Sequence, residues 1–233
     1  MTFRQLKRKV KSVPLIGKTY DFVYGRRKTQ RILKQREEMF SNNAGLKIVS
    51  TISNLLHKEG IASFPDFGTL LGIVRDGRLL SWDNDIDFGI IMNDSTEWNN
   101  LKNILEKNNF TLIHQFKYDD EIFEQTYLYE NMSIDFFRHV NMDHYCKYYT
   151  FSQDKKMNDP TVFYDIVESR TVKITELKNK YVNSFEFFIP SNSEVFLADI
   201  YGENWRIPDP KFSNGTSPAR YGIIGNTGIK EIF

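Results

Sequence analysis

Three aspartates at every second position, Asp83, Asp85 and Asp87, are the feature that most constrains how this chain folds. They stand in the run SWDNDIDFGI, which leads directly into an apolar stretch. Alternate residues of an extended strand point to the same face, so these carboxylates would repel one another and their pKa values would rise. The chain therefore has to fold so that a cation or a set of hydrogen-bond donors compensates this charge.

A glycine turn precedes the acidic run. Residues 61–67 have the pattern of a short strand, and Gly68-Thr69 then opens the apolar segment TLLGIVR, which we expect to form a short helix. Glycine permits a tight turn, and we expect the first helix amides and the Thr69 hydroxyl to face outward, as they do in sites that bind anions. A phosphate at this turn and a metal on Asp85 and Asp87 would together account for the charge cluster.

Two other structures could place acids in this run. An EF-hand loop is disfavoured, because counting from Asp83 puts Gly89 at position seven instead of six, and a strand follows instead of a helix. A solvated acidic turn is the plain alternative, although it does not predict carboxylates that continue into a strand. Asp135 interrupts the apolar strand expected over 132–139, so we expect it to join the acidic site, unless it pairs with Arg138 or a lysine at a sheet edge.

The remaining periodicity predicts an α+β fold, a mixed sheet with helices on one side. Helices are expected over 29–59, 95–109 and 193–202, where caps and apolar stripes agree. Strands are expected over 85–92, 110–117, 124–130, 132–139 and 144–151, and a strand pair over 171–189 with its turn at residues 178–180.

Composition narrows the class of protein. The 233 residues are 40% hydrophobic and contain one cysteine, so neither a disulfide framework nor a multi-cysteine zinc site is available. No stretch is long and apolar enough for a membrane span, and no signal peptide is apparent, so we expect a cytoplasmic protein. We expect one catalytic domain over 41–233, preceded by a leader over 1–40.

The leader has a charge opposite to that of the body. Residues 1–36 hold twelve Lys and Arg and one acid, whereas the rest of the chain holds 29 acids and 19 bases. Phe3, Leu6, Val10 and Val13 recur at helical spacing until Pro14. Such a basic amphipathic segment suits the anionic inner face of a membrane, or it docks on its own acidic domain; periodicity leaves both open. A nucleic-acid partner is not expected, because the body is acidic.

Four blocks of the chain, taken together, resemble the LicD/fukutin family. They are GTLLGIVR, SWDNDIDFGI, IDFF and FLADIYGENWRIPDP, and the resemblance runs from about residue 45 to residue 211. It implies a nucleotidyltransferase-like fold that moves a phospho-alcohol, such as phosphocholine or a polyol phosphate, from a CDP-linked donor to a glycan. The cysteine-rich zinc insertion of the larger animal members is missing, and the leader is no part of the family motifs.

The resemblance also implies roles for individual residues. It places Mg²⁺, or alternatively Mn²⁺, on Asp85 and Asp87, with Asp135 as a further ligand or as the base that takes the acceptor proton. It places Gly68, Thr69 and Arg75 near the donor phosphates, and Tyr201, Gly202 and Trp205 in a motif that shapes the pocket. Asp83 would position the loop or a water. Trp82 either stacks on a nucleobase or packs beneath the acidic loop.

The expected activity is therefore Mg²⁺-dependent transfer of a phospho-alcohol to a hydroxyl of a cell-surface glycan, which can be lipid-linked. Three alternatives remain open. Nucleotidyl transfer from an NTP would use the same acids. A glycosyltransferase of the DxD type would leave the Gly68-Thr69 turn without a role. An inactive glycan-binding protein would have no reason to keep the clustered charge.

Overall fold

The computed structural model describes residues 43–233 except 84, 93, 95 and 153–163, and it does not describe the side chains of residues 226 and 227. The leader over 1–40 and the first part of the helix expected over 29–59 lie outside the described residues, so both stay predictions. No helix in the described part of the chain is long and apolar enough to cross a membrane.

Helices and strands mostly fall where the periodicity put them. The helices are α3 (Asn43–Lys58), α4 (Phe67–Leu71), a π-helical turn (Gly72–Asp76), α5 (Glu97–Lys107), α6 (Ser193–Tyr201) and a short 3-10 helix (Asn214–Thr216). The strands are β1 (Ser63–Pro65), β2 (Asp85–Ile91), β3 (Thr111–Tyr118), β4 (Glu121–Tyr129), β5 (Met132–Asn141), β6 (Tyr145–Ser152), β7 (Tyr164–Val172), β8 (Leu177–Val182), β9 (Phe185–Pro190) and β10 (Arg220–Ile232).

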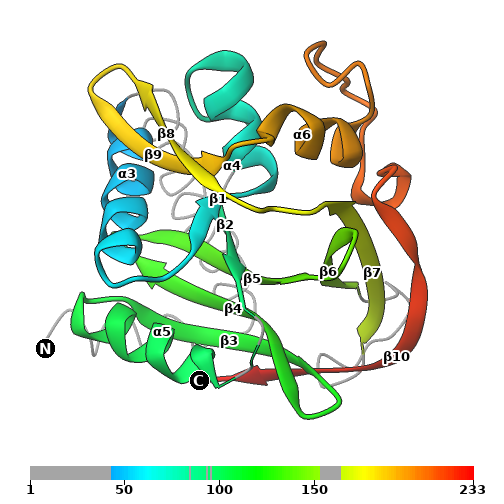
Figure 1. The fold of residues 1–233 in the computed structure, drawn as a ribbon. Coiled ribbons are helices and arrows are strands. Elements are labelled where there is room, and N and C mark those ends of the chain that lie inside the picture. The colour runs from blue at the N-terminus through cyan, green and yellow to red at the C-terminus, as the bar shows by residue number, and fades with distance from the viewer. Residues whose placement is uncertain (1–42, 84, 93, 95, 153–163) are drawn as a thin grey trace, which may run out of the picture. The chain divides into compact units, whose positions relative to one another are not determined.

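The main sheet closes into a six-stranded barrel (Figure 1). Its strand order is β1-β2-β5-β4-β3-β10-β7-β6, and a further pairing of β5 with β6 closes the ring. All strand pairs are antiparallel except β2 with β5, which are parallel. The expected mixture of helix and sheet is confirmed, but the barrel was not predicted, and the strands β7 and β10 were missed.

Strand β5 holds the two parts of the sheet together. One edge pairs with β4, while the other pairs first with β2 over Ser133–His139 and then with β6 over His139–Asn141. Its apolar residues Ile134 and Phe136 are fully buried. Asp135 points to the face of β5 opposite to these apolar residues. Because β5 lies between β2 and β4, Asp135 lies beside both of these strands.

The strand pair expected over 171–189 is present, but its turn is not at residues 178–180. These residues lie inside β8, and the chain reverses after Val182, where Asn183 has φ 55. Asparagine tolerates the left-handed conformation that this turn requires. Asn179 instead donates a hydrogen bond across the pair from its Nδ2 to Glu186 Oε1 at 2.6 Å.

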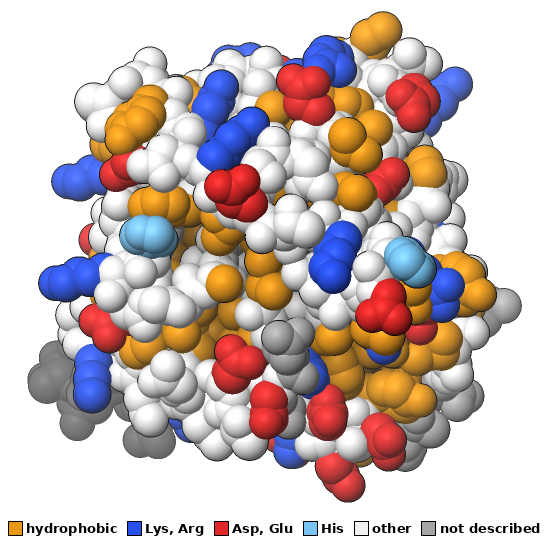
Figure 2. All heavy atoms as spheres, viewed as in Figure 1, with side chains coloured by type: hydrophobic (Ala, Val, Ile, Leu, Met, Phe, Trp, Pro, Cys, Tyr) orange, Lys and Arg blue, Asp and Glu red, His pale blue; other side chains and the backbone are white. Residues whose placement is uncertain are grey.

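The described surface carries both signs of charge. On the face shown in Figure 2, Lys and Arg are scattered among apolar side chains, while acidic side chains gather along the lower edge. Large apolar side chains exposed on the described residues include Trp82, Ile207, Tyr221 and Ile223. The first two lie at the pocket described below.

Gly89 allows β1 to pack on β2, and this gives a test of the packing. A Cβ at Gly89 would lie 2.3 Å from Phe64 Cζ, and the Phe64 ring is itself fixed by edge contacts with Phe196 and His139. We expect Gly89→Ala to lower the free energy of unfolding by about 1–3 kcal/mol, because overpacking strains a close-packed core. Gly222→Ala in β10 is the matched control, since its added Cβ meets no atom within 4 Å. Urea denaturation of both variants measures the difference, and equal losses would contradict this account.

Candidate active site

Three carboxylates share one face of the parallel strand pair. In the β2–β5 register Asp85 lies opposite Ser133 and Asp87 lies opposite Asp135. Alternation along β2 puts Asp85 and Asp87 on the same side, and the pairing adds Asp135 beside them. The structure thus brings together the three acids that the sequence singled out from distant segments.

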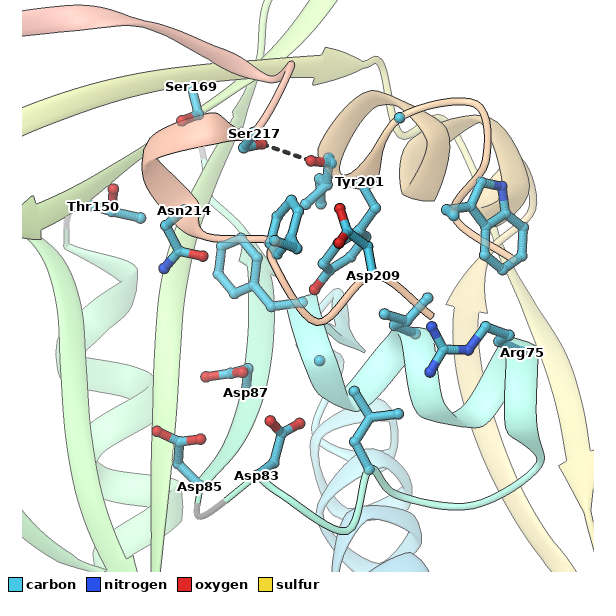
Figure 3. Close-up of a pocket in the computed structure, with 18 of the residues that line it drawn as sticks. Arg75, Asp83, Asp85, Asp87, Thr150, Ser169, Tyr201, Asp209, Asn214 and Ser217 are labelled. Carbon is cyan, nitrogen blue, oxygen red and sulfur yellow. Dashed lines mark hydrogen bonds between the residues drawn. The ribbon is translucent and has the colours of Figure 1, made fainter. Parts of the chain in front are cut away.

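These acids form the floor of a large pocket of about 1360 Å³. Figure 3 shows Asp83, Asp85 and Asp87 together at its base, with Arg75 to one side and Thr150 and Ser169 to the other. Among the described residues that line it, one side chain is basic, Arg75, and seven are acidic: Asp83, Asp85, Asp87, Glu124, Asp135, Glu203 and Asp209. The pocket therefore carries a strong excess of negative charge.

Burial and mutual repulsion raise the pKa values of the floor carboxylates. Burial, followed by the charge of Asp85 and then that of Asp135, raises the pKa of Asp87 well above its usual value. Burial also raises the pKa of Asp83 and that of Asp135 to about 6 each, with Asp85 adding to both. Oδ1 of Asp135 is buried without a hydrogen-bond partner among the described residues. Each of these carboxylates would be stabilised by a cation in the pocket.

The Gly68 turn brings Asp83 against the backbone. A Cβ at Gly68 would lie 2.4 Å from Asp83 Oδ2, so a larger residue here would displace this carboxylate. The turn begins at Phe67, which adopts φ 40, a conformation that is strained for an aromatic residue. Its ring packs edge-on against Phe137 at 5.0 Å. The turn therefore positions an acid, in addition to any ligand that it binds.

The Thr69 hydroxyl does not face outward as expected. Thr69 is 2% exposed, and its Oγ1 accepts a hydrogen bond from the Asp87 backbone N–H at 3.0 Å. Thr69 is the third residue of α4, which spans only Phe67–Leu71 before the π-helical turn. Thr69 thus ties α4 to β2 next to a floor carboxylate, and a contact of its hydroxyl with donor phosphates stays a prediction.

Asp66 and His139 form a buried pair behind the turn, which the sequence did not predict. His139 Nε2 lies 2.6 Å from Asp66 Oδ2, and both side chains are completely buried. Burial alone would lower the pKa of His139, but the charge and hydrogen bond of Asp66 raise it to about 10. Asp66 also accepts from the Phe67 N–H through Oδ1 at 2.8 Å and donates its own N–H to the Asp87 carbonyl at 2.9 Å. A carboxylate one residue before a helix is a known capping signal, so the sequence did hold a cue.

The other predicted residues lie on the pocket wall. Arg75 makes a two-pronged ion pair with its neighbour Asp76, through Nε at 2.8 Å and Nη2 at 2.9 Å. Trp205 is 4% exposed, and the Arg206 guanidinium lies 4.3 Å from its ring centre. Trp82 is 67% exposed, so the expectation that it packs beneath the acidic loop is wrong. Its stacking on a nucleobase stays a prediction.

Two parts of the pocket were not found from the sequence. Glu124 on β4 lies near Asp135, and burial together with the Asp135 charge raises the pKa of Glu124 well above its usual value. Beyond the block FLADIYGENWRIPDP, Asn214 and Ser217 also form part of the wall (Figure 3). The EIFEQTY run around Glu124 looks like an ordinary amphipathic strand, so sequence alone gave no reason to select it.

The donor atoms suit a divalent cation, although no ligand cluster is assembled. Within the described residues, no group of three or more His, Cys, Asp or Glu side chains is placed to hold a metal ion. The floor nevertheless offers hard carboxylate oxygens, one of them buried and unpartnered, in a pocket whose described lining has a single basic side chain. Oxygen donors of this kind are what Mg²⁺ and Mn²⁺ bind.

Comparison with known proteins identifies a family. Residues 60–192 match the family model described as LicD/FKTN/FKRP, nucleotidyltransferase domain, which is more than half of the chain. The resemblance expected from the sequence blocks is confirmed, although the last block, FLADIYGENWRIPDP, lies beyond the matched range. Membership suggests a phosphotransferase that acts on glycans.

Similarity to solved structures and to curated proteins adds little. The crystal structure of ANT(2")-Ia in complex with adenylyl-2"-tobramycin is similar with a TM-score of 0.40 and 11% sequence identity, over 73% of this chain and 82% of that chain. A likeness of this size does not establish a shared fold. No curated protein matches the chain.

The buried Asp66–His139 pair predicts a pH dependence of stability. The pKa of His139 is raised to about 10 in the folded protein, so its contribution is complete below about 6.5, the unfolded value, and is lost as the pH rises toward 10. We expect His139→Gln to lower the free energy of unfolding by about 3–5 kcal/mol at pH 7, because Asp66 is left buried without its cation. The variant should also lose less stability than the wild type between pH 7 and 10.

Urea denaturation across this pH range measures both effects. His57→Gln is the control, because the His57 ring stacks on Phe188 at 3.7 Å and its loss removes packing only. Parallel pH profiles for the wild type and His139→Gln would refute the ion pair.

Proposed function

This chain belongs to the LicD/FKTN/FKRP family, and from that membership we propose that it transfers a phospho-alcohol from a CDP-linked donor to a hydroxyl of a cell-surface glycan. The observation that carries the proposal is the placement of Asp85, Asp87 and Asp135 on one face at the floor of a pocket with a large excess of acids. The proposal includes that these three carboxylates act together with a divalent cation, in the manner of a nucleotidyltransferase.

The acidic floor needs a cation before it can accept phosphates. A pyrophosphate group would be repelled by the acidic lining, and the one described basic side chain there is already paired with Asp76. Asp85, Asp87 and Asp135 would hold Mg²⁺, with Mn²⁺ as a substitute. When bound, the ion supplies charge neutralisation and polarises phosphate oxygens.

The walls of the pocket give the donor its remaining contacts. The pyrophosphate lies over the Phe67–Gly68 turn, next to the Asp83 carboxylate that packs against Gly68. Arg75 has five N–H donors, of which Asp76 takes those on one edge, and the others offset charge on the departing CMP. Trp82, with most of its ring exposed at the pocket, stacks on the cytosine, while Trp205 shapes the wall.

The reaction is one displacement at the phosphorus that carries the alcohol. The acceptor hydroxyl oxygen forms a bond to this phosphorus as the bond to the bridging oxygen breaks, and CMP leaves with that oxygen and its electron pair. The acceptor proton passes to a carboxylate, a role that we assign to Asp135, or to water if Asp135 serves wholly as a ligand. Placement and charge neutralisation supply most of the catalysis in such a transfer, so no covalent intermediate is required.

Nucleotidyl transfer is the second candidate, because the matched family model is described as a nucleotidyltransferase domain. In that reaction an NTP would lose pyrophosphate instead of a CDP-alcohol losing CMP. The same floor would serve both, and the identity of the released product separates them.

The assignment of the floor predicts opposite effects on activity and on stability. We expect Asp87→Asn to reduce turnover by about 100-fold or more, since a ligand to the cation is lost. We also expect its melting temperature without metal to rise or stay the same, because one of several clustered charges is removed. Asp143→Asn, at an exposed bend, is the control for removing an acid elsewhere. If the variant retains more than about a tenth of the wild-type rate, the assignment is wrong. A tenfold loss of rate corresponds to about 1.4 kcal/mol in activation free energy.

Donor binding should require a divalent cation. We expect calorimetric titration with Mg²⁺ present to detect binding of CDP-alcohols, and EDTA to abolish it, because the floor repels the pyrophosphate without a cation. Product analysis with the same donors and a glycan acceptor should show CMP. Equal affinity with and without metal, or release of pyrophosphate from NTPs as the main reaction, would count against phospho-alcohol transfer.

A further inference from the structure

A row of side chains crosses the sheet from the acidic floor to β3. Asp135 on β5 lies opposite Thr126 on β4, and Thr126 lies opposite His114 on β3. Residues directly opposite each other on paired strands point to the same face, so all three side chains lie on the face that carries the floor acids. Neither Thr126 nor His114 lines the pocket. The row therefore joins a floor carboxylate to two groups that a ligand in the pocket does not touch.

Thr126 and His114 are within hydrogen-bond distance of each other. Thr126 Oγ1 lies 3.0 Å from His114 Nε2, and Thr126 is buried. A hydroxyl group has one proton to donate, and it can accept a hydrogen bond at the same time. Thr126 can therefore link His114 on one side to a second partner on the other.

Asp135 is the second partner of Thr126. Burial raises the pKa of Asp135 to about 6, and the strongest opposing influence is the hydrogen bond of the Thr126 side chain, which lowers it. Asp135 Oδ1 has no hydrogen-bond partner among the described residues, so few groups restrain this carboxyl group. An ionised carboxylate only accepts hydrogen bonds, so the Thr126 proton has to point at Asp135. The same proton is then not available to His114.

The proton on the His114 ring decides in which direction the hydrogen bonds run. Burial, followed by the charge of Lys230, lowers the pKa of His114 to about 4, so the ring is neutral at pH 7 and carries one N–H. With this proton on Nε2, His114 donates to Thr126 Oγ1 and leaves the Thr126 proton for Asp135. With the proton on Nδ1, Nε2 would accept the Thr126 proton, and Asp135 would lose its donor.

We propose that His114 and Thr126 are positioning residues that act through Asp135: His114 donates from Nε2 to Thr126, and Thr126 donates to the Asp135 carboxylate. These donors fix the orientation of the carboxyl group and leave its remaining lone pairs for the cation. The inference rests on the proposed function, because it takes Asp135 to hold that cation. Loss of such a partner, one step behind a metal ligand, typically weakens metal binding by about 10–100-fold.

Nuclear magnetic resonance of the wild type measures the direction of the hydrogen bonds. Spectra of ¹⁵N-labelled histidine distinguish a ring nitrogen that carries a proton from one that does not. His114→Phe identifies the His114 signals by their loss, and it keeps a ring at the edge contact with Phe116, which is at 5.4 Å. We expect the His114 proton on Nε2 at pH 7. A proton on Nδ1 would overturn the proposal.

Binding of Mn²⁺ measures the effect on the floor. Electron paramagnetic resonance follows free Mn²⁺ during a titration with CDP present, since CDP supplies the pyrophosphate. We expect Thr126→Val, which removes the hydroxyl and keeps the branched shape, to weaken Mn²⁺ binding about tenfold, whereas Thr126→Ser should restore most of it. His114→Phe should weaken binding by a smaller factor. Added to Thr126→Val, it should cause no further loss, because His114 acts through Thr126.

Thr171→Val is the matched control and should bind Mn²⁺ as the wild type does. Thr171 is another buried strand threonine, on β7, and its Oγ1 has no hydrogen-bond partner among the described residues. Unchanged binding in Thr126→Val would overturn the positioning role and leave the proposed function intact, and so would additive losses in the double variant. If the wild type binds no Mn²⁺ even with CDP, both the proposed function and this inference are wrong. The wild-type spectra decide the direction of the hydrogen bonds even if Thr126→Val does not fold.

Discussion

The parallel pairing of β2 with β5 is the interaction on which the rest of the site depends. It sets Asp87 directly beside Asp135, and alternation along β2 adds Asp85 to the same face. The neighbouring strand pairs are antiparallel. The parallel pair joins two segments that are far apart in the sequence, and it brings their acids together. Burial first, and the neighbouring carboxylates second, raise the pKa values of Asp87 and Asp135 in this arrangement. A bound cation would offset this repulsion, which is why the proposed function includes one.

Behind the floor, the protein holds the surrounding elements in place with a charge pair of its own. Asp66 contacts the start of α4, the backbone of β2 and His139 of β5, and Thr69 adds a second tie from α4 to Asp87. The segment that the sequence presented as a phosphate cradle is thus also a structural clamp. Because His139 and Asp66 are both fully buried, neither pairs with a ligand, and their role is to keep the Phe67–Gly68 turn and the floor in register.

The local parts of this site were predictable and the long-range parts were not. Asp85 and Asp87 stand out because charge repeats with strand periodicity, and Asp135 stands out because it interrupts an apolar strand. Glu124 lies in an ordinary amphipathic strand, and only the pairing of β4 with β5 reveals that it shares a face with Asp135. Strand β10 was missed because GIIGNTG has neither alternation nor strand propensity, and its pairing with β3 and β7 stabilises it instead. Closure of the barrel likewise depends on pairing between strands that are far apart in the sequence.

The charge distribution in the pocket also sets how its ligands depend on one another. Among the described lining residues Arg75 is the one base, and Asp76 already neutralises much of it, so in the proposed reaction a pyrophosphate needs a divalent cation to bind the floor. Such coupling is reciprocal: the donor raises the affinity for the cation by the factor by which the cation raises the affinity for the donor. In the proposed reaction the floor therefore governs whether a donor binds.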